Sequence, residues 1–165
     1  MKNDIEIFQI RKEHIPSFYA CFDGVAQERI YLGRLKAPPY ENVESFVLEK
    51  IEKDIPHFVA VTDERVIGWC DIYPATMETF EHSAELGMGV HKDYRGQGLG
   101  RKLMEKTLEK AKAQGFERIE LEVYPTNTVA IYLYEKMGFE VEGRKRKARK
   151  LDGEYQDKLM MAVLF

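Results

Sequence analysis

Hydrophobic and polar positions follow two spacings along the chain, and each spacing predicts a type of element. Residues 5–10 (IEIFQI) alternate apolar and polar side chains, as a half-buried strand does. Two later β-rich runs flank the short DER turn, which indicates a hairpin. The complete set of predicted strands covers residues 5–10, 58–62, 66–73, 84–90 and 118–123, followed by two strands that turn at Asp152-Gly153.

Four other stretches carry apolar residues three and four positions apart, which is the spacing of one helix face. Asn42 and Asn127 are suitable caps for the second and fourth of these helices. Gly115 and Gly138 are suitable residues to end the third and fourth. The predicted helices cover residues 15–26, 43–51, 99–111 and 128–136.

The elements therefore follow the order β-α-α-β-β-β-α-β-α-β-β. Antiparallel strands come first, and a strand–helix–strand unit, which needs a parallel right-handed crossover, comes later. We predict an α+β fold with a mixed, mostly antiparallel central sheet of about seven strands flanked by helices. No repeat, low-complexity tract or linker interrupts the sequence, so a single domain is expected over residues 1–165.

Composition narrows the class of protein. The chain is 44% hydrophobic and 32% charged, which is typical of a soluble globular protein, and its net charge of −3 predicts neither nucleic acid nor a membrane as partner. No apolar run approaches the ~18 residues of a membrane span. The first residues are too charged for a secretory signal, so none is expected. Cys21 and Cys70 lie far apart and predict reduced, packed thiols in a cytoplasmic protein.

A dense basic run, GRKRKARK at residues 143–150, resembles a nucleic-acid patch. It precedes a predicted hairpin turn, and the returning strand KLMMAVLF is nearly all apolar. We therefore interpret the run as an outer strand whose charges prevent edge-to-edge pairing. A role in holding an acidic substrate or a partner subunit is the alternative.

Three glycines stand at alternate positions in GVHKDYRGQGLGRKL (residues 89–103), between a predicted strand and a predicted helix. Glycine reaches positive φ and lets a ligand approach the backbone, and a helix start offers unpaired N–H groups. The junction favours an anion such as pyrophosphate, with Arg95 and Arg101 as further contacts; a tight turn without a ligand is the alternative. The dinucleotide pattern G-x-G-x-x-G and the triphosphate pattern G-x-x-x-x-G-K-[ST] both fail at Arg101.

RGQGLG (residues 95–100) matches the signature [RQ]-x-x-G-x-[GA], and through it the chain resembles the GNAT-type N-acetyltransferase superfamily, which binds acetyl-CoA. ELGMGVHKDYRGQGLGRKLMEKTLEKA is similar to that family's fourth strand and third helix. VYPTNTVAIYLYEKMGF is similar to its later asparagine and LYEKxGF helix. The resemblance covers nearly the whole chain and points to the small bacterial amino-acid and antibiotic-type acetyltransferases.

The resemblance implies acetyl-CoA as co-substrate and suggests which residues bind it. Backbone groups of Met88, Gly89 and Val90 would meet the acetyl and pantetheine arm. Asn127 would contact the pantetheine arm, a role compatible with helix capping. The pyrophosphate would be held by Arg95, Gly96, Gln97, Gly98, Leu99 and Gly100.

Acetyl transfer to an amine needs a base, because a free alkylamine with a pKa near ~10.4 is mostly protonated at pH 7. Glu85, on the strand entering the site, is the predicted base, and ordered water is an alternative. The resemblance implies that Tyr134 donates a proton to the leaving thiolate, with Tyr132 as the weaker choice. Weaker candidates for the base are Glu28, Asp71, Glu120 and His82.

Acceptor selection is expected in AQERIYLGRLKAPPY (residues 26–40) and on the face of the first hairpin. Arg29 would grip a substrate carboxylate and Tyr31 would line the pocket, although an ordinary polar helix end explains the segment equally well. Trp69 and Asp71 are the predicted contacts on the hairpin face. No metal site is expected.

These observations predict an acetyl-CoA-dependent N-acetyltransferase that acts on a primary amine of a small molecule, an amino acid or an amine-bearing toxin or antibiotic. Direct attack is expected because Cys70 lies in a core-like strand without an adjacent base. A protein N-terminal acetyltransferase and a non-catalytic acyl-CoA sensor are the alternatives. A homodimer is one option for the assembly.

Overall fold

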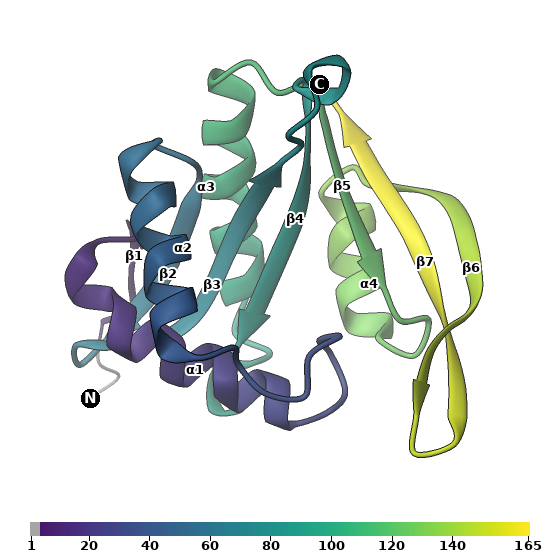
Figure 1. Cartoon of the computed structure of the whole chain (residues 1–165), viewed down its shortest axis with the longest axis horizontal. Helices are drawn as coiled ribbons and strands as arrows, with labels where there is room; N and C mark the ends of the chain where they lie inside the picture. Colours follow the sequence, from purple (N-terminus) through teal and green to yellow (C-terminus); the bar gives the residue numbers. More distant parts are fainter. Residues whose placement is uncertain (1–3) are drawn as a thin grey trace. The chain divides into compact units, whose positions relative to one another are not determined.

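The computed structural model describes residues 4–165, and its seven strands form one sheet in the order β1-β2-β3-β4-β5-β7-β6 (Figure 1). The longer helices and the strands follow one another as predicted, and the α+β fold with a mixed sheet is confirmed. The chain divides into two compact units, Met1–Ile72 with Gly87–Ala111 and Tyr73–Leu86 with Lys112–Phe165. The single domain stays a prediction. Within residues 4–165, every helix is too short or too polar to cross a membrane.

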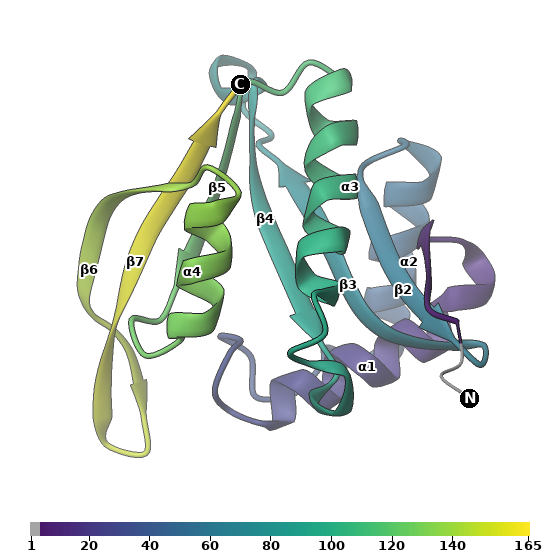
Figure 2. The same cartoon turned by 180° about the vertical axis from the view of Figure 1, so that it is seen from behind.

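The first unit places helices on both faces of its strands. α1 and α2 lie on one face and α3 lies on the other (Figures 1 and 2). β1 pairs with β2, and β2 with β3, in antiparallel fashion. The elements that contribute to this unit are β1 (Glu6–Gln9), α1 (Ile15–Gln27), α2 (Tyr40–Glu52), β2 (His57–Thr62), β3 (Arg65–Pro74), the end of β4 (Ser83–Val90) and α3 (Leu99–Ala113).

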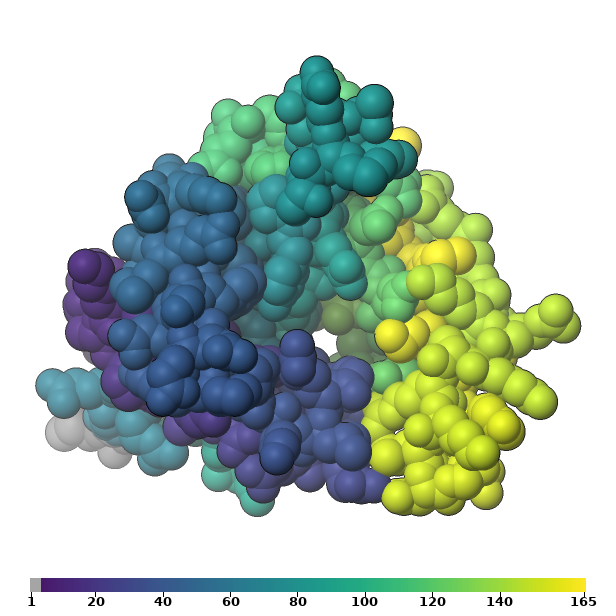
Figure 3. Space-filling model, viewed as in Figure 1, coloured from purple at the N-terminus to yellow at the C-terminus, as the bar shows by residue number. Residues whose placement is uncertain are grey.

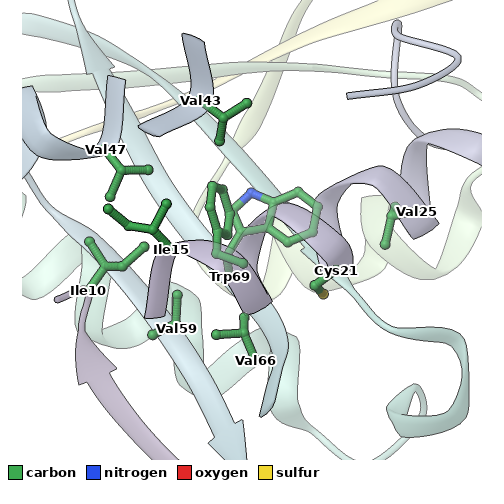
Figure 4. Packing of buried hydrophobic residues seen from close by; sticks show 10 residues of the cluster. Ile10, Ile15, Cys21, Val25, Val43, Val47, Val59, Val66 and Trp69 are labelled. Atoms are coloured by element: carbon green, nitrogen blue, oxygen red, sulfur yellow. The ribbon is translucent and has the colours of Figure 1, made fainter. Parts of the chain in front are cut away.

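Trp69 lies within the hydrophobic core of the first unit (Figure 4). Its indole is 3% exposed and meets the rings of Phe18 and Phe22 on α1 edge-on, at centroid distances of 5.7 and 5.6 Å. On its other side the indole approaches β4 so closely that a Cβ at Gly89 would lie 2.3 Å from it. Residue 89 must therefore be glycine for the two strands to pack in this way.

The start of α2 differs from the prediction. Asn42 was expected to cap the helix, but the helix begins at Tyr40 and Pro39 is the capping residue. The Pro39 carbonyl accepts the N–H groups of Asn42 and Val43 at 3.0 and 3.3 Å. The prediction of an Asn42 cap was wrong because a side-chain cap is one of several ways to begin a helix, and here a main-chain carbonyl serves instead.

The second unit holds a parallel strand pair and a long antiparallel hairpin. In the parallel pair, Ser83, Ala84 and Glu85 of β4 lie opposite Arg118, Ile119 and Glu120 of β5. α4 covers one face of β5 and β7 (Figure 2). Besides the start of β4, the elements are β5 (Arg118–Val123), α4 (Thr128–Lys136), β6 (Glu140–Leu151) and β7 (Glu154–Leu164).

The basic run lies on β6, at the edge of the sheet beside the more apolar β7, so its predicted outer position is confirmed. Figure 3 shows the β6–β7 hairpin, in yellow and yellow-green, with side chains projecting from its outer edge. The pairing shifts between Lys145 and Arg149. Within this bulge Lys147 adopts a φ of 49°, and its N–H donates to the Asp157 carboxylate at 2.8 Å. A bulge and a row of cations both make an edge strand a poor template for further pairing.

A buried ion pair joins α2 to β3. The Lys50 ammonium donates to the Asp71 carboxylate, and their side chains are only 3% and 1% exposed. Burial lowers the pKa of Lys50, and the charge of Asp71 partly offsets that effect. Burial and the Lys50 charge together hold the pKa of His57, a fully buried neighbour, well below its ordinary value. The pair therefore depends on both charges being present.

We predict that Lys50→Met lowers the free energy of unfolding by about 3 kcal/mol, because it leaves the buried Asp71 carboxylate without its cation. Urea unfolding measures the change. Lys50→Met with Asp71→Leu is expected to recover most of the loss, since apolar replacement of a buried pair is often neutral. Lys53→Met, which removes an exposed pair with Glu49, is the control and should unfold like the wild type. An unchanged Lys50→Met protein would contradict the prediction.

Candidate functional site

The glycine loop of the first unit, residues 96–100, has the geometry of an anion-binding site. Gly96 and Gly98 adopt φ angles of 72° and 75°, which favour glycine. A Cβ added to either residue would meet no heavy atom within 4 Å, so the space beside both is open. α3 begins at Leu99, at the end of the loop, where the first N–H groups of a helix lack intrahelical partners. These residues fit a pyrophosphate.

The Arg95 side chain is engaged elsewhere in the first unit. Its Nε donates to the carbonyl of Val90 at 2.9 Å, and its two terminal nitrogens donate to the Glu28 carboxylate at 2.8 and 2.6 Å. The guanidinium carbon also lies 4.6 Å from the centre of the Tyr31 ring. Arg101 pairs with Glu105 at 2.8 Å. The expected phosphate contacts of both arginines therefore compete with ion pairs that they form to glutamates of this chain.

Met88, Gly89 and Val90 form the end of β4 and are partly exposed. Trp69 fills the space on one side of Gly89, which fixes the backbone of this segment from within the core. β4 begins in the second unit and ends in the first, so the strand itself connects Glu85 to this backbone.

The structure separates the predicted acceptor residues into two groups. Arg29 is exposed, with a left-handed φ of 63°, and Tyr31 is partly exposed nearby in the chain. Trp69 and Asp71 are buried in the core and in the pair with Lys50. Their hairpin was expected to present an outer face, but β3 is buried along both faces for most of its length. Trp69 and Asp71 are therefore not part of the proposed acceptor site.

Glu85 lies in the second unit on a sheet face rich in carboxylates. It lines a pocket of about 120 Å³ that Glu120, Glu122 and Met160 also line. Partial removal from water, and then the charges of Glu122 and Glu120, raise the pKa of Glu85. Within residues 4–165, Glu85 has no ion pair, whereas Lys145 and Lys158 both bind Glu122. Glu85 is therefore the carboxylate on this face with the environment of a base.

Glu122 was not among the predicted site residues, although its charge acts on Glu85. Burial alone would raise the pKa of Glu122, but hydrogen bonds from Lys145 and Lys158 outweigh it and lower that pKa. The period-two pattern of β5 does place Glu120 and Glu122 on one face, which is the one signal that could have found it.

α4 of the second unit carries the predicted acid and the predicted pantetheine contact. The Asn127 side chain accepts the N–H of Ala130 at 3.3 Å, so the predicted cap is confirmed. Tyr134 is 8% exposed and lies 5.9 Å from Phe139, ring centre to ring centre. Tyr132 is 62% exposed, on the outer side of the helix. Of Tyr132 and Tyr134 on α4, Tyr134 is thus the one that faces the interior of this unit.

Neither cysteine has the environment of an acetyl carrier. Burial is the main cause that raises the pKa of Cys21 and of Cys70 to about 12, which keeps both as thiols at neutral pH. Both are free and buried. Within residues 4–165, no group of three His, Cys, Asp or Glu side chains could hold a metal ion.

A family model described as the acetyltransferase (GNAT) family matches residues 11–139. The chain belongs to the GNAT acetyltransferase family. It is 32% identical to the L-amino acid N-acetyltransferase of Escherichia coli K12 over 139 residues, which cover 83% of this chain and 85% of the relative. It is 33% identical to the [ribosomal protein bS18]-alanine N-acetyltransferase of the same strain, over 55% of this chain and 62% of the relative.

Solved structures agree with this assignment at the level of the fold. A putative acetyltransferase from Salmonella typhimurium, solved with its cofactor acetyl-CoA, superposes with a TM-score of 0.91. The two chains are 18% identical, and the match covers 98% of this GNAT chain and 94% of the other. This protein is therefore an N-acetyltransferase of the GNAT family.

We predict that Gly98→Glu weakens acetyl-CoA binding at least tenfold, because a side chain and a negative charge would enter the open space of the glycine loop. Isothermal titration calorimetry measures the affinity. Gly153→Glu is the matched control, since Gly153 also has a positive φ of 83° and open space but lies in the β6–β7 turn. Unaltered binding by Gly98→Glu would overturn the assignment of the loop.

Proposed function

We propose that this GNAT enzyme acetylates the primary amine of a small molecule, an amino acid or a compound that carries an amino-acid-like amine, by direct attack. The observation that carries the proposal is the match to an L-amino acid N-acetyltransferase, which extends over 85% of that relative. The inert thiols of Cys21 and Cys70 support direct transfer without an acetyl-cysteine step. They also support the proposal of a cytoplasmic location. Assembly as a homodimer stays a prediction.

The first unit supplies the proposed donor seat, the binding site for acetyl-CoA that residues 88–90 and 96–100 form. Acetyl-CoA, when bound, supplies the acetyl group as a thioester. Backbone N–H groups of residues 96–100 hold its pyrophosphate at the start of α3, and backbone groups of residues 88–90 hold the arm that carries the acetyl group. The proposed pantetheine contact is Asn127, whose amide nitrogen is not used by the helix cap.

Glu85 is the proposed base. A carboxylate with a raised pKa accepts a proton from an ammonium group more readily than one with an ordinary pKa. Partial removal from water is the main cause of the raised pKa of Glu85; the charges of Glu122 and Glu120 add to it, and Lys158 and Lys145 partly offset it. The carboxylates of Glu85 and Glu122, on one sheet face, thus have different proposed roles. Glu85 is the base, and the charge of Glu122 helps to raise the pKa of Glu85.

Tyr134 is the proposed acid. A phenol with a pKa of about 10 keeps its proton at neutral pH and can give it to the leaving thiolate from its Oη. The contact with Phe139 holds the ring against the interior of the second unit. Arg29 and Tyr31 are the proposed acceptor contacts, because a guanidinium can bind the carboxylate of an amino acid with two hydrogen bonds.

A second candidate acceptor is the amino terminus of a protein. The relative that acetylates alanine of ribosomal protein bS18 favours it, although the match covers only 62% of that relative. A peptide acceptor lacks a free carboxylate next to its amine, so Arg29 would have no role in binding it. The two candidates therefore differ in how they respond to Arg29.

We predict that the enzyme releases CoA thiol from acetyl-CoA with free amino acids or their analogues, and faster than with a peptide that begins with alanine. A thiol-release assay over a panel of amines measures the rates. Tyr134→Phe is expected to lower kcat at least tenfold while acetyl-CoA affinity holds. Arg29→Gln should raise the KM for a free amino acid and leave the KM for its amide unchanged. Turnover with the peptide alone would establish the second candidate.

We predict that the lower break in the pH profile of log(kcat/KM) follows the ionisation of Glu85. Activity falls as pH drops through the pKa of Glu85, since a protonated carboxyl cannot act as base, and the raised pKa places that fall above the range of an ordinary carboxyl. Glu122→Gln removes a charge that raises this pKa, so the break moves to lower pH. Glu85→Gln removes the break and lowers kcat about 100-fold. A break that persists in Glu85→Gln would exclude Glu85.

A further inference from the structure

The side chain of Arg95 is directed to the end of α1. All three of its nitrogens donate hydrogen bonds, one to the carbonyl of Val90 and two to the carboxylate of Glu28. Tyr31 lies against the guanidinium with its ring centre 4.6 Å away. The Arg95 and Glu28 side chains are 30% and 23% exposed, so the pair is partly withdrawn from water. Such a bidentate pair has one preferred geometry.

Glu28 occupies a position where the chain changes direction. It caps the C-terminus of α1, and the next residue, Arg29, has a left-handed φ of 63°. Its partner stands 67 residues later, directly before the first glycine of the loop. One ion pair therefore joins the end of α1 to the end of β4 and to the entry of the glycine loop, all within the first unit.

We propose that Glu28 and Arg95 are a positioning pair for the donor seat, and that Arg95 is not a phosphate ligand. The pair fixes the Val90 carbonyl and the backbone that leads into the loop, so that the N–H groups of residues 96–100 are preorganised. This inference rests on the proposed seat for the pyrophosphate. Three of the five N–H groups of Arg95 are engaged with Val90 and Glu28, and they direct the guanidinium toward the end of α1, so that only its two remaining N–H groups could meet a phosphate.

The two roles of Arg95 predict opposite effects of Glu28→Gln on acetyl-CoA binding. If the pair positions the loop, loss of the carboxylate charge weakens binding about tenfold, as Arg95→Gln also does. If Arg95 is a phosphate ligand, Glu28→Gln releases it from a competitor and binding is unchanged or tighter. Calorimetry with acetyl-CoA distinguishes the outcomes without any acceptor amine.

The double variant sharpens the test. Glu28→Gln with Arg95→Gln should bind no more weakly than the weaker single variant, because both single variants remove one interaction. If Arg95 contacted phosphate, Arg95→Gln would weaken binding whether or not Glu28 is present. A double variant that binds much more weakly than the weaker single variant would overturn the proposal.

Steady-state kinetics separate positioning from general destabilisation. In Glu28→Gln the KM for acetyl-CoA is expected to rise about tenfold, while kcat at saturating donor stays within about twofold. A partly unfolded enzyme would instead lose kcat with an unchanged KM, which would count against the proposal. Glu49→Gln, which removes an exposed ion pair on α2, is the control. Failure of the donor seat itself is seen separately, as unaltered acetyl-CoA binding in Gly98→Glu.

Discussion

Packing of Trp69 is the constraint on which the first unit depends. The indole contacts Phe18 and Phe22 on α1 and at the same time occupies the space where residue 89 would carry a side chain. Burying a residue of this size contributes strongly to stability, and its shape fixes its neighbours. One side chain on β3 thus sets the position of α1 and the course of β4. These are the segments whose ends carry Glu28 and Val90.

The degree of burial decides what each ion pair of the protein can do. Lys50 and Asp71 are almost fully buried, so their pair acts on stability and each charge requires the other. Arg101 and Glu105 are largely exposed, and such pairs contribute little. The pair of Glu28 and Arg95 lies between these limits. It is buried enough to have a fixed geometry and exposed enough to stand beside a site that a ligand must reach.

Local signals explain most of what the sequence predicted. β5 and α4 were predicted with their observed bounds. Gly96 and Gly98 were identified because a positive φ is a local property, which the residue type at that one position indicates. The short 3₁₀ turns at residues 12–14, 78–80 and 92–94 were missed, since three residues carry no periodic pattern. The burial of Trp69 was missed because an alternating apolar and polar pattern identifies the exposed face only of a strand that is buried on one side, and β3 is buried on both. The partner of Arg95, 67 residues away, leaves no local signal.

The signature [RQ]-x-x-G-x-[GA] allows arginine or glutamine at its first position, and the structure suggests what the two share. Both side chains can donate an N–H to a main-chain carbonyl, as Arg95 donates to Val90. A hydrogen bond of this kind is open to both residues, whereas only arginine can also form an ion pair. In this chain, arginine adds a bidentate bond to Glu28, which connects the glycine loop to α1.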